Sequence, residues 1–91
     1  MKTDKQNDDQ GQIDVNKEKT YSLILHNDDY HTFDYVIDAL IKVCGLGSEQ
    51  ATQCTYLIHF KDSCEVKRGN IAILLPMQND LIKLDLKAEI K

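Results

Sequence analysis

The spacing of apolar residues predicts a strand followed by a helix near the start of the folded region. Residues 21–26, "YSLILH", form a short apolar run that stops at the polar "NDD" of residues 27–29, as a strand does. Over residues 33–44 the apolar positions recur at helical spacing. Thr32 stands where an N-cap is needed and Gly45 supplies a stop. A polar turn therefore joins a strand to a helix.

A second helical pattern follows after a short break. Ser48 is placed as its N-cap, directly before the acidic Glu49. Small or apolar residues fall on one face of this segment: Ala51, Cys54, Thr55 and Ile58. The pattern predicts that this helix ends near Lys61-Asp62.

Two later segments alternate between polar and apolar residues, which is typical of strands. They are "SCEVK", residues 63–67, and "LKAEIK", residues 86–91. The segment between them has a helical composition, but Pro76 cannot occupy an unbroken helix interior. Either a turn precedes a helix that starts at Leu75-Pro76, or one helix is kinked there. The order βααβαβ predicts an α+β two-layer sandwich, with a three-stranded antiparallel sheet and three helices on one face.

The first nineteen residues differ in composition from the rest of the chain. They contain few apolar groups, so they cannot bury enough surface to offset the entropy of ordering. We therefore predict a disordered extension over residues 1–19 and one core domain over residues 20–91. A core of roughly seventy residues has little room for an enclosed active site and favours a shallow surface pocket.

Charge and cysteine content narrow the function classes. The formal charge of −4 argues against nucleic acid as a partner, because phosphate binding needs clustered Lys and Arg. No apolar run approaches the ~20 residues of a membrane span, and no signal-peptide pattern is present. Three cysteines, spaced unlike a zinc knuckle or a disulfide framework, favour reduced and mostly buried thiols in the cytoplasm.

The acidic turn and the histidines raise the possibility of a metal site or an active site. Asp28, Asp29 and His31 offer metal ligands with His59, but adjacent aspartates diverge in an extended turn and no zinc spacing is present. A carboxylate with His59 as general base lacks a convincing nucleophile. We therefore expect no metal, no cofactor and no enzyme. From the residues alone, a plain polar turn and a solvated histidine remain open.

Read together, three segments resemble the ClpS family of bacterial adaptors. They are "NDDYHTFDYVIDAL", "QATQCTYLIHF" and "LKAEI", and the resemblance covers residues 21–90. It implies an α+β domain that binds the first residue of a protein when that residue is Leu, Phe, Tyr or Trp. It also implies delivery of that protein to a ClpA- or ClpC-type unfoldase of the Clp protease.

The resemblance also implies which residues form the binding site. Asn27, Asp28 and His59 match the positions that bind the α-amine: Asp28 supplies the charge, and a neutral His59 accepts a hydrogen bond. On this interpretation, protonation of His59 would repel the ligand in acid. The remaining site positions implied are the apolar pocket (Phe33, Thr55, Ile58 and Leu86) and the border (Asp29, Tyr30 and His31).

The chain departs from the family pattern at positions that shape the pocket. His31-Thr32 stands where many members have Thr-Pro, Phe33 where many have Met, and Thr55 where a larger apolar residue is common. Asp62 replaces a frequent Gly, although Asp tolerates the left-handed conformation better than most residues. The alternative function is a regulatory module that docks on the unfoldase and has lost binding of N-terminal residues.

Overall fold

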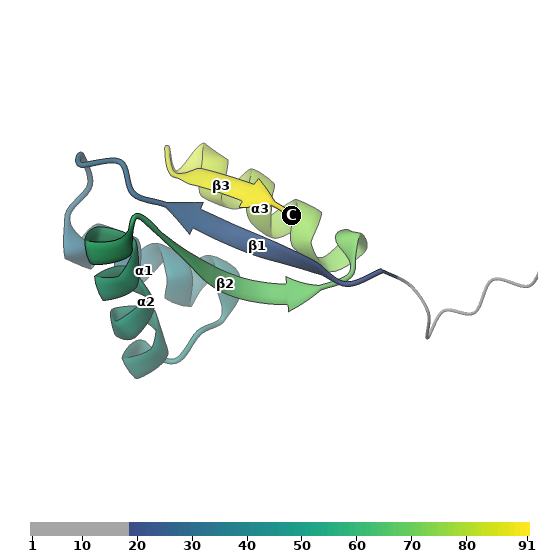
Figure 1. Ribbon diagram of the computed structural model, residues 1–91, viewed down its shortest axis with the longest axis horizontal. Coiled ribbons are helices and arrows are strands. Elements are labelled where there is room, and N and C mark those ends of the chain that lie inside the picture. The colour runs from purple at the N-terminus through teal and green to yellow at the C-terminus, as the bar shows by residue number, and fades with distance from the viewer. Residues whose placement is uncertain (1–18) are drawn as a thin grey trace, which may run out of the picture.

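The computed structural model describes residues 19–91 and has the predicted order of elements (Figure 1). The predicted extension, residues 1–19, lies outside the described residues except for Lys19. The elements are β1 (Tyr21–His26), α1 (Phe33–Cys44), α2 (Ser48–Lys61), β2 (Ser63–Gly69), α3 (Ile71–Lys83) and β3 (Lys87–Ile90).

The three strands form one antiparallel sheet in the order β2-β1-β3; in the view of Figure 1, α1 and α3 lie behind it and α2 lies at its lower left. The last residue of β1, His26, pairs with the first residue of both neighbours, Ser63 of β2 and Lys87 of β3. The β1–α1, α2–β2 and α3–β3 connections therefore meet at one end of the sheet. This α+β two-layer arrangement is the predicted fold.

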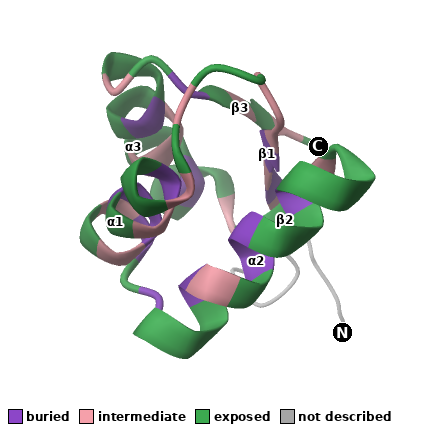
Figure 2. Ribbon diagram, turned by 90° about the vertical axis from the view of Figure 1, so that its left-hand side faces the viewer, coloured by how far each residue is buried: buried purple, intermediate pink, exposed green. Residues whose placement is uncertain are grey.

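The core lies between the helices and the inner face of the sheet (Figure 2). Leu23 and Leu25 of β1 are at most 1% exposed, because their alternating positions face the helices. Leu40 of α1 and Leu74 and Leu81 of α3 are fully buried in the same cluster. Burial of each such side chain contributes about 1.5–3 kcal/mol to the stability of the fold.

The ends of the first two helices follow local chemistry. The Thr32 hydroxyl accepts a hydrogen bond from the Tyr35 N–H, and Gly45 adopts a left-handed φ of 70°, as predicted. The prediction that Ser48 caps α2 is wrong, because Gly47 occupies the cap position and Ser48 is the first helical residue. Gly47 has no side chain to accept a hydrogen bond, but its carbonyl accepts one from the Ala51 N–H.

The α3 segment is one helix that includes Pro76, so the alternative of a helix starting at Leu75-Pro76 is wrong. Asn70 begins it, since its side-chain oxygen accepts a hydrogen bond from the Ile73 N–H. Pro76 has no N–H to donate to the backbone carbonyl one helical turn earlier. Because Pro76 is exposed, water can bind that carbonyl instead. Strand β2 runs two residues beyond the predicted 63–67, and β3 begins after Leu86 rather than at it.

Three aspartates adopt left-handed backbone conformations in the connections at the shared end of the sheet. Asp29 has a φ of 60°, Asp62 of 75° and Asp85 of 66°. Asp62 directly follows α2 and is its C-cap residue. Aspartate is among the few residues with a side chain that enter this region readily, so each connection turns sharply without glycine.

The cysteines are free, and Cys44 and Cys54 are buried as predicted, whereas Cys64 is half-buried. Burial raises the pKa of the Cys44 thiol to about 11 and that of Cys64 to about 12. Thiolate is the reactive form of cysteine, so these two thiols are poor nucleophiles at neutral pH. No helix among the described residues is long and apolar enough to cross a membrane.

Candidate functional site

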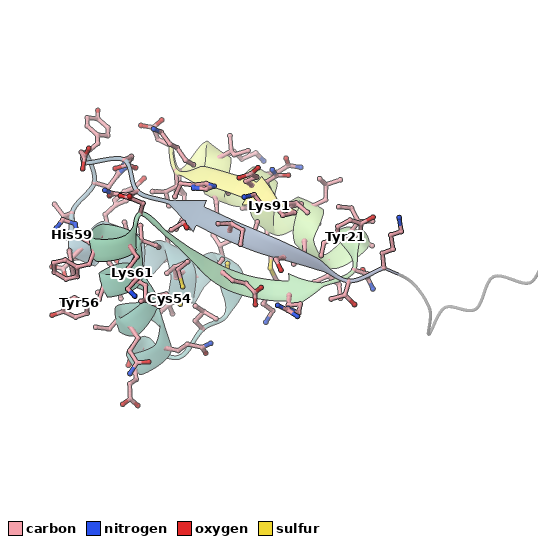
Figure 3. All side chains as sticks on the ribbon, in the orientation of Figure 1. Tyr21, Cys54, Tyr56, His59, Lys61 and Lys91 are labelled. Atoms are coloured by element: carbon pink, nitrogen blue, oxygen red, sulfur yellow. The ribbon has the colours of Figure 1, made fainter. Side chains whose placement is uncertain are left out.

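A surface pocket lies at the end of the sheet where β1 stops and where His59 and Tyr56 of α2 lie (Figure 3). The β1–α1 connection, α1, α2 and the residue before β3 all contribute to it because the antiparallel register brings them together. The residues that line it are Leu25, His26, Asn27, Asp28, His31, Thr32, Phe33, Val36, Thr55, Ile58, His59 and Leu86.

Asp28 organises the turn that follows β1. Its Oδ1 accepts hydrogen bonds from the backbone N–H groups of Tyr30 at 2.9 Å and His31 at 3.0 Å. Its Oδ2 lies 2.7 Å from Nδ1 of His31. The Asp28 side chain is only 13% exposed, so it is not the solvated carboxylate expected of a polar turn. Asp28 thus shapes the turn and also lines the pocket.

These contacts determine the charge of Asp28. Burial on its own would raise the pKa of the carboxyl group, but hydrogen bonds from the backbone and side chain of His31 and from the Tyr30 backbone outweigh it. The net effect holds the pKa of Asp28 below its ordinary value of 3.8. Hydrogen bonds of this kind favour the charged form. The pocket therefore contains a carboxylate at neutral pH.

Asn27 and Asp29 are paired with each other in the same turn. The Asn27 side-chain N–H donates to Asp29 Oδ1 at 3.1 Å, and the Asp29 backbone N–H donates to Asn27 Oδ1 at 3.4 Å. The Asn27 backbone N–H also donates to the Asp62 carbonyl at 2.8 Å, which ties the turn to the end of α2. Asn27 lines the pocket, whereas Asp29 is exposed and does not.

His59 lies opposite the acidic turn, on the last turn of α2. Its ring is exposed and makes edge-to-face contacts with Phe33 and Phe60, with centroid distances of 5.1 Å in both cases. Within residues 19–91 no hydrogen bond engages the His59 ring. Its nitrogens are therefore available to a ligand, unlike those of His26, which lies 2.8 Å from Glu89, or of His31.

The pocket walls below these polar groups are apolar. Thr55 is buried, and its hydroxyl donates to the Ala51 carbonyl at 2.8 Å, which leaves its methyl group for the pocket. Ile58 and Leu86 are also buried at this place. The free space between the walls is about 20 Å³, enough for about one water molecule. Phe33, which is half-buried, also lines this space.

Most of the predicted site residues come together in this pocket: Asn27, Asp28, His31, Phe33, Thr55, Ile58, His59 and Leu86. Tyr30 is 77% exposed and lines an adjoining hollow with Asp28 and Asp85 instead. Sequence reasoning missed Leu25 and Val36, whose periodic positions look like ordinary core. It also missed His26 and Thr32, which reach the pocket because β1 ends and α1 begins beside it.

The fold and this pocket define a small α+β binding module. A buried carboxylate and a histidine ring with free nitrogens stand beside apolar walls, a combination suited to a cationic group attached to an apolar one. Residues 19–91 contain no group of three or more His, Cys, Asp or Glu residues placed to hold a metal ion.

Comparison with known protein families shows which family this chain belongs to. The family described as "ATP-dependent Clp protease adaptor protein ClpS" matches residues 16–89. The chain belongs to the ClpS family. Among curated proteins, the Acetivibrio thermocellus ClpS adapter is 33% identical over 72 residues, which cover 71% of this chain and 73% of that protein.

Other similarities are shorter or more distant. The Clostridium acetobutylicum ClpS adapter is 42% identical over 45 residues, so the matched segment spans 50% of this chain and 45% of that protein. The structure of Agrobacterium tumefaciens ClpS2 bound to L-phenylalaninamide has a TM-score of 0.70 and is 18% identical. The structural match covers 82% of this chain and 98% of the ClpS2 chain. At 18% identity it shows that the two proteins share a fold.

Proposed function

We propose that this chain is an adaptor that binds the first residue of a substrate protein when that residue is Leu, Phe, Tyr or Trp. It then hands the substrate to a ClpA- or ClpC-type unfoldase of the Clp protease, in the cytoplasm. Membership of the family of Clp protease adaptors supports the delivery role. The proposed partners are the N-terminal segment of the substrate protein and the unfoldase. We propose neither a metal nor a cofactor.

The observation that carries this proposal is the Asp28 carboxylate at the edge of an apolar pocket. A free α-amine is a cation with three hydrogen-bond donors, so it needs a charged acceptor and neutral acceptors close together. Asp28 supplies the charge, and the Asn27 side chain and the unprotonated His59 ring supply further acceptors. An internal peptide segment has no such amine, so the site selects chain termini.

The apolar walls are suited to the side chain of the first residue. Burial of a large apolar side chain contributes about 1.5–3 kcal/mol, and each charge-assisted hydrogen bond a similar amount. After the entropy of ordering is subtracted, a free energy of about −8 kcal/mol is reasonable, which corresponds to micromolar affinity. The ligand of the related ClpS2 structure, L-phenylalaninamide, joins a free amine to a bulky aromatic side chain, which agrees with this assignment.

Phe33 is the aromatic part of the proposed apolar wall. Its ring rests edge-on against His59 and Tyr56 at 5.1 Å and 5.0 Å between centroids. In the proposed complex it packs against the side chain of the first residue.

The proposal is tested with peptides that differ only in residue one. Labelled peptides that begin with Leu, Phe, Tyr, Trp or Ala are titrated with the protein, and binding is followed by fluorescence anisotropy. We expect micromolar affinity for the bulky residues, at least tenfold weaker binding for Ala, and about 100-fold weaker binding when the amine is acetylated. The alternative, an unfoldase-docking module without this activity, predicts no binding to any of these peptides and undiminished binding to the unfoldase.

A further inference from the structure

Of the three histidines that line the pocket, all within the described residues, His31 is the one that hydrogen-bonds to the carboxylate of the acidic turn. Its Nδ1 lies 2.7 Å from Asp28 Oδ2, and the two side chains are 11% and 13% exposed. Its backbone N–H donates to the other oxygen of the same carboxylate at 3.0 Å. His31 therefore holds both oxygens of the group that is proposed to bind the amine.

The ring of His31 is fixed from other directions. It stacks on Tyr35 of α1, with centroids 4.5 Å apart and an interplanar angle of 17°. The Tyr35 hydroxyl in turn donates to the Leu84 carbonyl at 2.6 Å, which anchors that ring to the end of α3. Nε2 of His31 lies 3.8 Å from Asp85 Oδ2. The imidazole thus lies between two carboxylates on separate connections.

We propose that His31 is a positioning residue for the Asp28 carboxylate and that protonation of its ring weakens the binding of a free peptide amine. This inference rests on the proposed function, because it takes the α-amine as the ligand of Asp28. A neutral imidazole with hydrogen on Nδ1 donates to Oδ2 and leaves the carboxylate its full negative charge. An imidazolium neutralises that charge and repels the ammonium group. It also gains an Nε2 hydrogen that faces Asp85.

The other titratable and charged groups around this ring are few. Its own loop contributes Asp28 and Tyr30, α1 contributes Tyr35, and the α3–β3 connection contributes Asp85. Lys87 lines the hollow that contains Asp28 and Asp85, and His26 and His59 line the pocket. Of the histidines, only His31 shares a hydrogen bond with Asp28, since His26 is engaged by Glu89 and His59 contacts Phe33 and Phe60.

The proposal adds His31 to His59 as a source of acid sensitivity. Protonation of either imidazole puts a positive charge in the pocket that binds the peptide amine. Couplings between sites are typically 5- to 150-fold, so we expect affinity for a free-amine Leu peptide to fall roughly tenfold from pH 7.5 to pH 5.5. The family resemblance alone would assign this loss to His59.

The experiment compares pH series of dissociation constants, at fixed salt, for the wild type and three variants. His31→Asn keeps a donor at the Nδ1 position without titrating, whereas His31→Ala removes the donor. We expect His31→Asn to bind more tightly than His31→Ala at pH 7.5 and to lose at least threefold less affinity than the wild type down to pH 5.5. His59→Gln, the matched control, should keep the part of the loss that comes from His31. A loss in His31→Asn as large as that of the wild type, or complete disappearance of the loss in His59→Gln, overturns the proposal.

A second measurement, made without peptide, tests whether His31 positions the Asp28 carboxylate. The carboxyl pKa of Asp28 is followed by NMR in the wild type and in His31→Ala. It should rise in the variant, because hydrogen bonds from His31 help to keep it low. An unchanged pKa of Asp28 overturns the inference. Failure of the wild type to bind any free-amine peptide would instead reject the proposed function, and the NMR result would still decide whether His31 controls Asp28.

Discussion

The charge of Asp28 can be removed with little change in the shape of the turn. Oδ1 accepts both backbone hydrogen bonds, from Tyr30 and His31, so Asp28→Asn can keep that oxygen in place. Only the charge and the Oδ2 acceptor are lost. We therefore expect the fold to remain, with a decrease in the free energy of unfolding of about 1–2 kcal/mol. Asp28→Ala is a poorer test because it would also release both N–H groups.

Binding should respond much more strongly than folding. A charge-assisted hydrogen bond is worth about 1.5–3 kcal/mol, so Asp28→Asn should weaken binding of a Leu peptide about 100-fold, or ~2.7 kcal/mol. Acetylation of the peptide should weaken binding to the wild type by a similar factor. In Asp28→Asn the same acetylation should cost less than about tenfold, because the ion–ion contact is already gone.

The assay is fluorescence anisotropy with both proteins and both peptides, which completes a double-mutant cycle. Urea unfolding of each protein serves as the control for folding. If acetylation weakens binding equally in the wild type and in Asp28→Asn, the amine and Asp28 are not coupled. The assignment of Asp28 as the partner of the amine would then be wrong, even if both single changes are harmful.

Three further results are expected. A Leu peptide should bind the wild type about tenfold or more tightly than an Ile peptide, because the branch at Cβ of Ile would place a methyl group against Phe33, and one misplaced methyl costs about 1–3 kcal/mol. Phe33→Met should reduce this difference in affinity. Equal binding of the two peptides by the wild type contradicts the place of Phe33 in the pocket wall. In anisotropy measurements at pH 8, His59→Ala should weaken binding about tenfold, and His59→Gln should recover most of the lost affinity. An unchanged affinity in His59→Ala would show that His59 is not part of the binding site. The lowered pKa of Asp28 means that its carboxylate adds stability above its unfolded value of 3.8 and loses this contribution as pH falls through the lower folded value. In urea unfolding, the stability difference between the wild type and Asp28→Asn should therefore be constant above about pH 5 and shrink as pH falls below 3.8. A pH-independent difference contradicts the lowered pKa of Asp28.

Local chemistry accounts for much of what the sequence predicted correctly. Thr32 and Gly45 bound α1 as expected because each acts on its immediate neighbours, through a hydrogen bond and a backbone conformation. Pro76 was ambiguous because its effect depends on whether the helix face around it is exposed, which tertiary packing decides. Ser48 is a better cap than Gly47 by side chain alone, but the backbone enters the helix one residue earlier.

The family resemblance supplied most of the pocket residues, and the register of the sheet explains why they meet. Periodicity could not predict that Asp28 would be largely buried, because adjacent polar residues normally indicate a solvated turn. The contact of His31 with Asp28 is also invisible in the sequence: three residues apart in a non-helical turn, two side chains meet only if the backbone folds back. Asp85 also lies beside the His31 ring, although the two residues are far apart in the sequence.

The three left-handed aspartates have a consequence for the speed of recognition. Asp29, Asp62 and Asp85 fix carboxylates on the three connections at one end of the sheet, where Gly would have been neutral. Their combined field extends about a Debye length, roughly 8–10 Å at physiological salt, beyond the surface. On the proposed function, the positively charged amine of a substrate would be attracted to this end before any contact forms, and an acidic segment behind it would be repelled. Added salt should therefore lower the association rate constant much more than it raises the dissociation rate constant.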